Sequence, residues 1–210
     1  FSGCTGLSEL SFNEGLVSIK QSAFEGCDAL SMVTLPSSLQ LLESSVFKYC
    51  DNLQPFVING SELSFSDCLP EHHTELVFGK DITKLSVESV GKNIKMVRFE
   101  DGAICQEITG SGFYSNKYIE QIKLPESLVS VSDYLFQNMQ ALKKVNVPRN
   151  MTSIGKLMFN NCKALTEVEL EEGLTCLGSS MFSGCTTLSK ISLPASLANV
   201  RGNVFENCTA

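Results

Sequence analysis

A repeat of 23 residues runs through this sequence. Short segments that begin with phenylalanine and commonly end in cysteine, such as FEGC at Phe24, recur at this spacing on both sides of an irregular middle. They begin at Phe1, Phe24, Phe47, Phe113, Phe136, Phe159, Phe182 and Phe205. A single unit of this length cannot bury its own apolar side chains, whereas a stack of units can. The chain is therefore expected to fold as a repeat solenoid.

Each unit contains one apolar-x-apolar step, which is the two-residue period of a β-strand. A turn residue such as Pro36 or Pro125 commonly follows, and proline ends a strand because it cannot donate a backbone hydrogen bond. The second member of each step is Phe12, Leu35, Ile58, Phe78, Phe99, Leu124, Val147, Leu170 and Leu193. We predict about nine units of 20–25 residues, with short parallel strands on one face and irregular or short extended or helical turns on the other. Residues 1–210 are expected to form a single solenoid, whose central units, about 59–112, are irregular.

The repeat resembles that of a known family. Residues 30–50, LSMVTLPSSLQLLESSVFKYC, match the unit L-x-x-I-x-L-P-x-x-L-x-x-I-x-x-x-A-F-x-x-C of the BspA-like (treponeme-type) leucine-rich repeats, and residues 119–139 match it apart from the cysteine. The resemblance implies a leucine-rich-repeat fold, a secreted or surface-displayed protein, and a role in adhesion and protein binding. Both terminal units lack a polar capping face, so we expect a fragment of a longer repeat protein whose ends stack on further repeats.

Six of the nine cysteines occupy one repeat position, three residues after the phenylalanine. This structural cysteine ladder consists of Cys4, Cys27, Cys50, Cys162, Cys185 and Cys208. Each cysteine could act as a small buried hydrophobic residue that donates weakly to a turn carbonyl, or adjacent units could be joined by disulfides. In-register side chains point the same way, which favours free thiols. No C-x-x-C motif occurs, so a zinc site has little support.

Composition excludes several classes of partner. The net charge of -7 provides no basic face for nucleic acid or for an anionic membrane. No apolar run approaches the roughly 18 residues of a membrane span, so we expect no membrane insertion in this segment. His72 and His73 are adjacent, and neighbouring side chains of an extended segment point apart, so a polar loop is favoured over a metal site. No nucleophile–base pair, phosphate loop or metal triad occurs, which predicts no catalytic residue, no cofactor and no enzymatic activity.

Three N-x-S/T sequons fall at turns of the repeat, at Asn59, Asn150 and Asn207. A turn can accommodate a glycan, so these asparagines are candidate N-glycosylation sites on a secretory route. They favour an extracellular or cell-surface location.

Side chains between the buried pair of each strand point outward and line one surface. The N-terminal half of this surface is apolar, and the C-terminal half is charged with mixed sign. The candidate partner-binding face consists of Met32, Thr34, Pro55, Val57, Val77, Met96, Arg98, Lys123, Lys144, Glu167 and Glu169. The alternative is that these outward residues only satisfy strand propensity.

These observations favour a non-enzymatic repeat module of a secreted or cell-surface protein that binds a protein or glycan partner. One alternative is a structural building block that stacks into a filament or an extracellular layer. A second is an intracellular scaffold, which the thiol ladder would tolerate.

Overall fold

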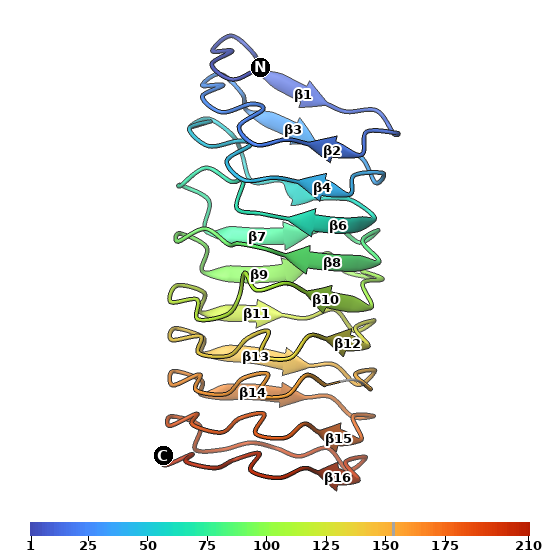
Figure 1. The fold of residues 1–210 in the computed structure, drawn as a ribbon, viewed down its shortest axis with the longest axis vertical. Coiled ribbons are helices and arrows are strands. Elements are labelled where there is room, and N and C mark those ends of the chain that lie inside the picture. Colours follow the sequence, from blue (N-terminus) through green and yellow to red (C-terminus); the bar gives the residue numbers. More distant parts are fainter. Residues whose placement is uncertain (153) are drawn as a thin grey trace.

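Short parallel strands form two stacks along the molecule (Figure 1). A computed structural model of the chain describes residues 1–152 and 154–210. The first stack contains β1 (Glu9–Ser11), β3 (Met32–Thr34), β5 (Val57–Ile58), β7 (Glu75–Phe78), β9 (Met96–Phe99), β11 (Gln121–Lys123), β13 (Lys144–Val147) and β14 (Glu167–Leu170). The second contains β2 (Ser18–Ile19), β4 (Leu41–Leu42), β6 (Glu62–Phe65), β8 (Lys84–Val87), β10 (Glu107–Thr109), β12 (Ser130–Val131), β15 (Cys176–Leu177) and β16 (Asn199–Val200). The prediction of a repeat solenoid with short parallel strands is confirmed.

The strands of the first stack lie where the apolar-x-apolar steps predict them, with one exception. Residues 191–193, the ninth expected strand, are not in a strand. A second irregularity separates β3 from β5, which belong to different sheets. Pro55 lies at this break, and a proline cannot donate to the strand ladder.

The opposite face of the solenoid is a second sheet and not a row of helical turns. Strands of two to four residues cross it in the reverse direction, and the described residues contain no helix. The prediction had left irregular, extended and helical turns open, and the structure selects short extended segments. A unit of 23 residues therefore has two strands and two turns, one turn at each edge of the solenoid.

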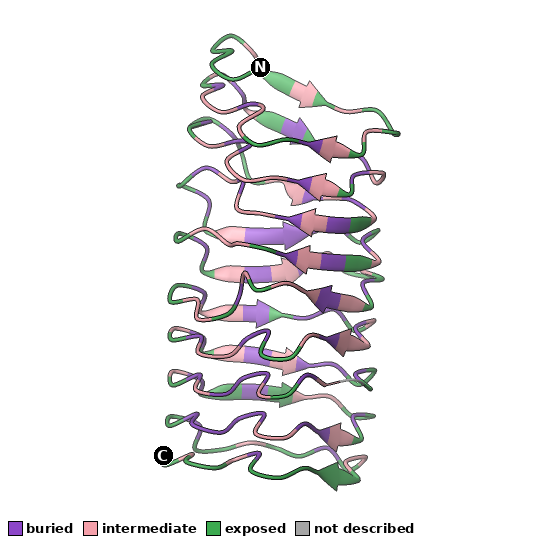
Figure 2. Ribbon diagram, viewed as in Figure 1, coloured by how far each residue is buried: buried purple, intermediate pink, exposed green. Residues whose placement is uncertain are grey.

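Leucine, valine, isoleucine and phenylalanine side chains of both sheets form one buried core. Figure 2 shows how the buried residues are distributed along the ribbon. Within one unit, Val33, Leu35, Leu39 and Leu42 are all buried. Along β13 buried and half-buried residues alternate, as the pleat of a strand requires. Burial is lowest at the ends of the stack, where both residues of β16 are exposed.

The turns that carry the repeated phenylalanines form one edge of the solenoid, which we call the phenylalanine edge. Phe159 stacks between Phe136 and Phe182, with ring centroids 5.4 and 5.6 Å apart. The residues two before and two after this ring, Leu157 and Asn161, have left-handed backbone conformations with φ of 53° and 58°. Glycine and asparagine adopt this conformation at little cost, which explains their frequency two residues after the phenylalanine.

Candidate functional site

The outward residues of the first stack form two columns in register. Met32 lies opposite Glu9, Met96 opposite Glu75 and Gln121, and Lys144 opposite Gln121. The pairs of the second column are Ser11–Thr34, Val57–Val77, Val77–Arg98, Arg98–Lys123 and Asn146–Glu169. The outward residues are therefore in register within each sheet, and the break between β3 and β5 divides the face in two.

The N-terminal, apolar part of this face is only partly exposed. Met32 is 55% exposed and Pro55 is exposed, whereas Val57 and Met96 are half-buried. Val77 is only 8% exposed, so the expectation that it offers an outward contact is wrong. It lies between Val57 and Arg98 on the two neighbouring strands.

Charged residues in the central and C-terminal parts of the face pair with one another. The Arg98 guanidinium donates to both carboxylate oxygens of Glu75, with Nε to Oε1 at 2.7 Å and Nη2 to Oε2 at 3.4 Å. These bonds raise the pKa of Arg98, so it stays charged. The Lys144 ammonium group donates to one carboxylate oxygen of Glu167. Lys123 and Glu169 are exposed, and the nearest carboxylate to Lys123 is that of Asp101 at 3.9 Å.

The cysteine ladder ties consecutive turns together. The Cys50 thiol donates to the Phe24 carbonyl oxygen at 3.1 Å, and Cys162 and Cys185 donate to Phe136 and Phe159 at 3.2 Å. Cys27 and Cys208 make the same contact, whereas Cys4 is exposed. All nine cysteines are free thiols in the structure. Each ladder thiol except Cys4 thus packs at the phenylalanine edge with one weak hydrogen bond.

Burial makes these thiols poor nucleophiles. It raises the pKa of Cys50 to about 11 and that of Cys185 to about 12. The off-ladder Cys105 is affected in the same way, with a pKa of about 12. A thiol with such a pKa is protonated at neutral pH, and only the thiolate attacks or binds metal.

The three sequons differ in exposure. Asn150 and Asn207 are exposed, although the Asn150 side chain donates to the Glu126 carbonyl oxygen at 2.8 Å. Asn59 is half-buried, with its amide oxygen packed against Gly79 of the next unit and without a hydrogen-bond partner. A glycan at Asn59 would require this side chain to leave the interface between units.

The two histidines converge, contrary to the expectation that they point apart. The Nε2 atoms of His72 and His73 each lie 2.9 Å from the Leu53 carbonyl oxygen, and the ring centroids are 4.6 Å apart. The prediction failed because this segment is a turn and not an extended strand. His73 is buried, which lowers its pKa, and the hydrogen bond to Leu53 opposes this shift.

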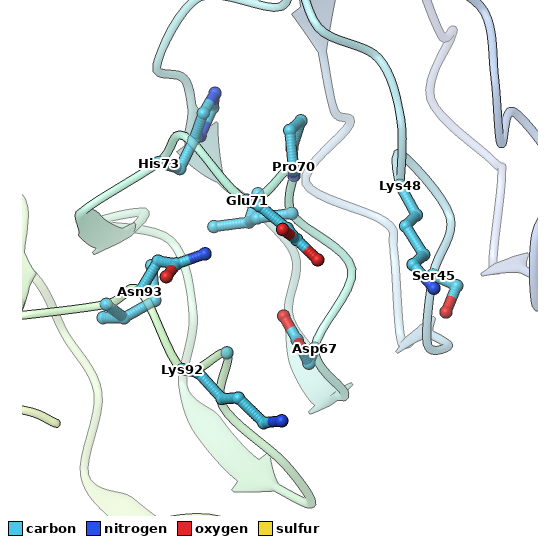
Figure 3. A pocket seen from close by; sticks show the side chains of 11 residues that line it. Ser45, Lys48, Asp67, Pro70, Glu71, His73, Lys92 and Asn93 are labelled. Atoms are coloured by element: carbon cyan, nitrogen blue, oxygen red, sulfur yellow. The ribbon is translucent and has the colours of Figure 1, made fainter. Parts of the chain in front are cut away.

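The phenylalanine edge is interrupted between Phe47 and Phe113, and a cavity of about 460 Å³ opens there (Figure 3). The units of this region contain 20 and 21 residues, and their turns at Leu69 and Gly91 lack the stacked ring. The irregular spacing is visible in the sequence, but it does not by itself predict a cavity. The missing phenylalanine was the available signal.

Opposite charges surround this cavity. The carboxylates of Asp67 and Glu71 face each other, and Lys48 and Lys92 stand on separate turns around them (Figure 3). Burial raises the pKa of Asp67, while the Leu69 N–H and Lys48 lower it. Among the ion pairs of residues 1–152 and 154–210, none joins these lysines to these carboxylates. The cavity therefore offers both donors and acceptors to a polar ligand.

In the part of the chain that the structure describes, no cluster of three or more His, Cys, Asp or Glu side chains could hold a metal ion. Nor does that part contain a helix long and apolar enough to cross a membrane.

Comparison with protein families decides the classification. The model of the BspA type leucine rich repeat region matches residues 1–93 and 89–210 with six copies. The chain belongs to the BspA-type leucine-rich repeat family. The resemblance drawn from the repeat is thus confirmed over the whole length. None of the curated proteins matches the chain.

Several solved structures are similar to this chain at low sequence identity. A leucine rich cell surface protein from Faecalibacterium prausnitzii is 18% identical, with 96% of this chain and 71% of that chain covered and a TM-score of 0.40. The pneumococcal vaccine antigen PcpA is 21% identical, with 94% and 58% covered and a TM-score of 0.44. A leucine-rich repeat protein from Bacteroides ovatus is 19% identical, with 99% and 78% covered and a TM-score of 0.32.

The matched segments together include the irregular centre, and they overlap at residues 89–93, which contain Gly91 and Lys92 of the cavity wall. The cavity therefore lies within the region that the family model matches.

Proposed function

We propose that this chain is a non-enzymatic recognition module of a secreted or cell-surface protein, and that it binds a partner protein through the outward face of the first stack. The observation that carries the proposal is the position of Met32, a large apolar side chain that is 55% exposed on the outward face of β3, opposite Glu9 of β1.

The N-terminal part of this face has the composition of an interface centre. Met32, Thr34 and Pro55 are exposed and lie on neighbouring units. Methionine is enriched at protein interfaces, and its flexible thioether adapts to an irregular partner surface. Burying such side chains against a partner removes apolar surface from water.

The charged part of the face suits the rim of the same interface. Arg98 and Lys144 are held by Glu75 and Glu167, so their positions are set before a partner arrives. Exposed ion pairs contribute only about 0–1 kcal/mol to stability, so their role at a rim would be orientation and specificity.

The location follows from the family, whose members are typically secreted or surface-displayed. Exposed sequons at Asn150 and Asn207 are compatible with a secretory route, and Asn207 is the better candidate because the Asn150 amide is engaged by Glu126. A protein displayed at the surface would use the face described above for adhesion.

Binding is tested on an array of purified extracellular-matrix and serum proteins. The variants Met32→Asp and Thr34→Asp place a charge on the face, and we expect at least a tenfold loss of affinity for each protein that the wild type binds. Val17→Asp is the matched control, since Val17 is 50% exposed but lies in a turn outside the face.

The proposal is overturned if no protein on the array binds the wild type, or if Met32→Asp and Val17→Asp weaken binding equally. Light scattering of the purified chain tests the alternative that the chain is a structural building block, because it detects filaments. Growth of long filaments that Met32→Asp does not affect would favour that alternative.

Location is tested on intact cells of the source organism with an antibody against this chain. Labelling without permeabilisation, together with a fall in intact mass after glycosidase treatment if the source is a eukaryote, is the expected result. Labelling only after permeabilisation would favour the intracellular scaffold.

A further inference from the structure

The chain has four tyrosines and no tryptophan, and all four tyrosine rings are 37–52% exposed. Two of them lie under a lysine ammonium group, because Lys48 stands 4.6 Å from the centroid of Tyr49 and Lys95 stands 5.8 Å from that of Tyr118. The other two, Tyr114 and Tyr134, have no such cover and line one notch together. An uncovered pair of tyrosines in a shared notch needs a separate explanation.

The notch lies on the phenylalanine edge, between the turns that follow β10 and β12. Its volume is about 430 Å³, within the range of small-ligand sites of about 300–1,000 Å³. Besides the two tyrosines, it is lined by Gly110, Ser111, Asp133 and Gln137. No aliphatic side chain and no cationic side chain is among these residues.

Two glycines allow the protein surface to be recessed beside the notch. A side chain at Gly110, whose φ is 93°, would overlap the Val87 carbonyl oxygen, and one at Gly112 would come within 2.8 Å of the Ser89 nitrogen. Other units have an apolar residue in place of Gly112, for example Leu135. The turn therefore lies closer to the unit before it, and the tyrosines project beside the recess.

Polar atoms beside the rings remain available. Asp133 accepts from the Lys156 backbone N–H through Oδ1 at 2.8 Å, which leaves Oδ2 for a ligand. The Gln137 amide nitrogen donates to Asn160 at 2.9 Å, which leaves its carbonyl oxygen. The notch thus combines two tyrosine side chains with a carboxylate oxygen and an amide oxygen.

We propose that this notch binds a neutral saccharide. One face of a pyranose ring carries C–H groups that pack against the electron-rich face of a tyrosine, while its hydroxyls donate to carboxylate and amide oxygens. An acidic sugar or a phosphate would meet Asp133 without a cation to balance it. A protein side chain anchored by apolar burial would find no aliphatic wall.

The test uses a printed glycan array, followed by titration of soluble lactose, maltose, cellobiose and N,N′-diacetylchitobiose against the whole chain. Tyrosine fluorescence reports binding directly, because the chain contains no tryptophan. We expect at least one neutral saccharide to bind, and Tyr134→Asn to weaken that binding about tenfold. Tyr114→Ser and Asp133→Asn should weaken it as well.

Tyr49→Asn is the matched control. Tyr49 and Tyr134 have left-handed φ of 59° and 64°, and asparagine adopts this conformation readily, so both variants should fold. Asp133→Asn keeps an oxygen for the Lys156 N–H, which preserves the fold in a second variant.

Three results would overturn the proposal: no saccharide bound by the wild type, equal binding by Tyr134→Asn and Tyr49→Asn, or loss of protein binding alone in Tyr134→Asn. The site is independent of the strand face. Met32→Asp should leave saccharide binding unchanged, so failure of one proposal is distinguishable from failure of the other.

Discussion

The Cys162 thiol lies 3.2 Å from the carbonyl oxygen of Phe136, the phenylalanine one unit earlier in the chain. The phenylalanine rings stack along the edge, and the thiols join each turn to the backbone of the one before it. Both contacts recur because the repeat brings the same pair of residues together in each regular unit. Local substitutions along this edge therefore test the fold one contact at a time.

Cys162→Ala should lower the free energy of unfolding by about 1–2 kcal/mol, because it leaves a small cavity and an unpaired buried carbonyl. Urea denaturation followed by circular dichroism measures the change. Cys4→Ala, at the exposed end of the same ladder, should stay within about 0.5 kcal/mol of the wild type. Equal stability of the two variants would contradict a structural role for the thiol.

Phe159→Ala should lower the free energy of unfolding by about 3–5 kcal/mol, since the ring is fully buried between two stacked neighbours. The control is Phe1→Ala, because Phe1 is largely exposed at the end of the stack. Thermal denaturation of both variants gives the comparison. A midpoint for Phe159→Ala close to that of Phe1→Ala would show that the stack contributes little.

Gly110→Ala should destabilise the protein by more than about 2 kcal/mol, because the new Cβ meets the rigid Val87 carbonyl and the backbone is left-handed. Gly102 shares the left-handed conformation, with φ of 75°, but faces open space. Gly102→Ala should therefore lower the free energy of unfolding by only about 1 kcal/mol. If the two variants unfold at the same urea concentration, the close approach at Gly110 is not present in solution.

The stability of the chain should depend on His73 below pH 6.5. Burial lowers the pKa of His73 in the folded protein, so the unfolded chain binds more protons as the pH falls through this range. The contribution of the neutral ring is fully present above pH 6.5 and is lost as the pH falls toward the lowered pKa. His73→Gln keeps a donor for the Leu53 carbonyl and removes this titration.

Urea midpoints at pH 7.5 and 5.5 measure the effect, with His73→Gln as the reference for all other titrating groups. The wild type should lose more stability than the variant over this interval. An identical loss in both proteins would show that His73 does not titrate differently in the folded chain.

The repeat period predicts the solenoid, the first stack of strands and the buried columns such as Val33 and Leu35. Each of these features depends only on residues that recur at a fixed spacing, so the sequence pattern is enough to predict them. The second sheet was left open, because a two-residue strand such as Leu41–Leu42 has too few residues to show an alternation. The burial of Val77 was missed for a related reason, since it depends on the side chains of adjacent units.

The sites were decided by tertiary structure. Asp67 faces Glu71 because two shortened units omit the phenylalanine that fills the corner in other units, and the size of the resulting space depends on how the turns pack. Tyr114 and Tyr134 share a notch because stacking places turns 23 residues apart side by side and two glycines draw one turn toward the unit before it. The repeat in the sequence determines the contacts that recur in every regular unit. The cavity and the notch lie at irregular units, so their shape depends on how the side chains and turns of those units pack.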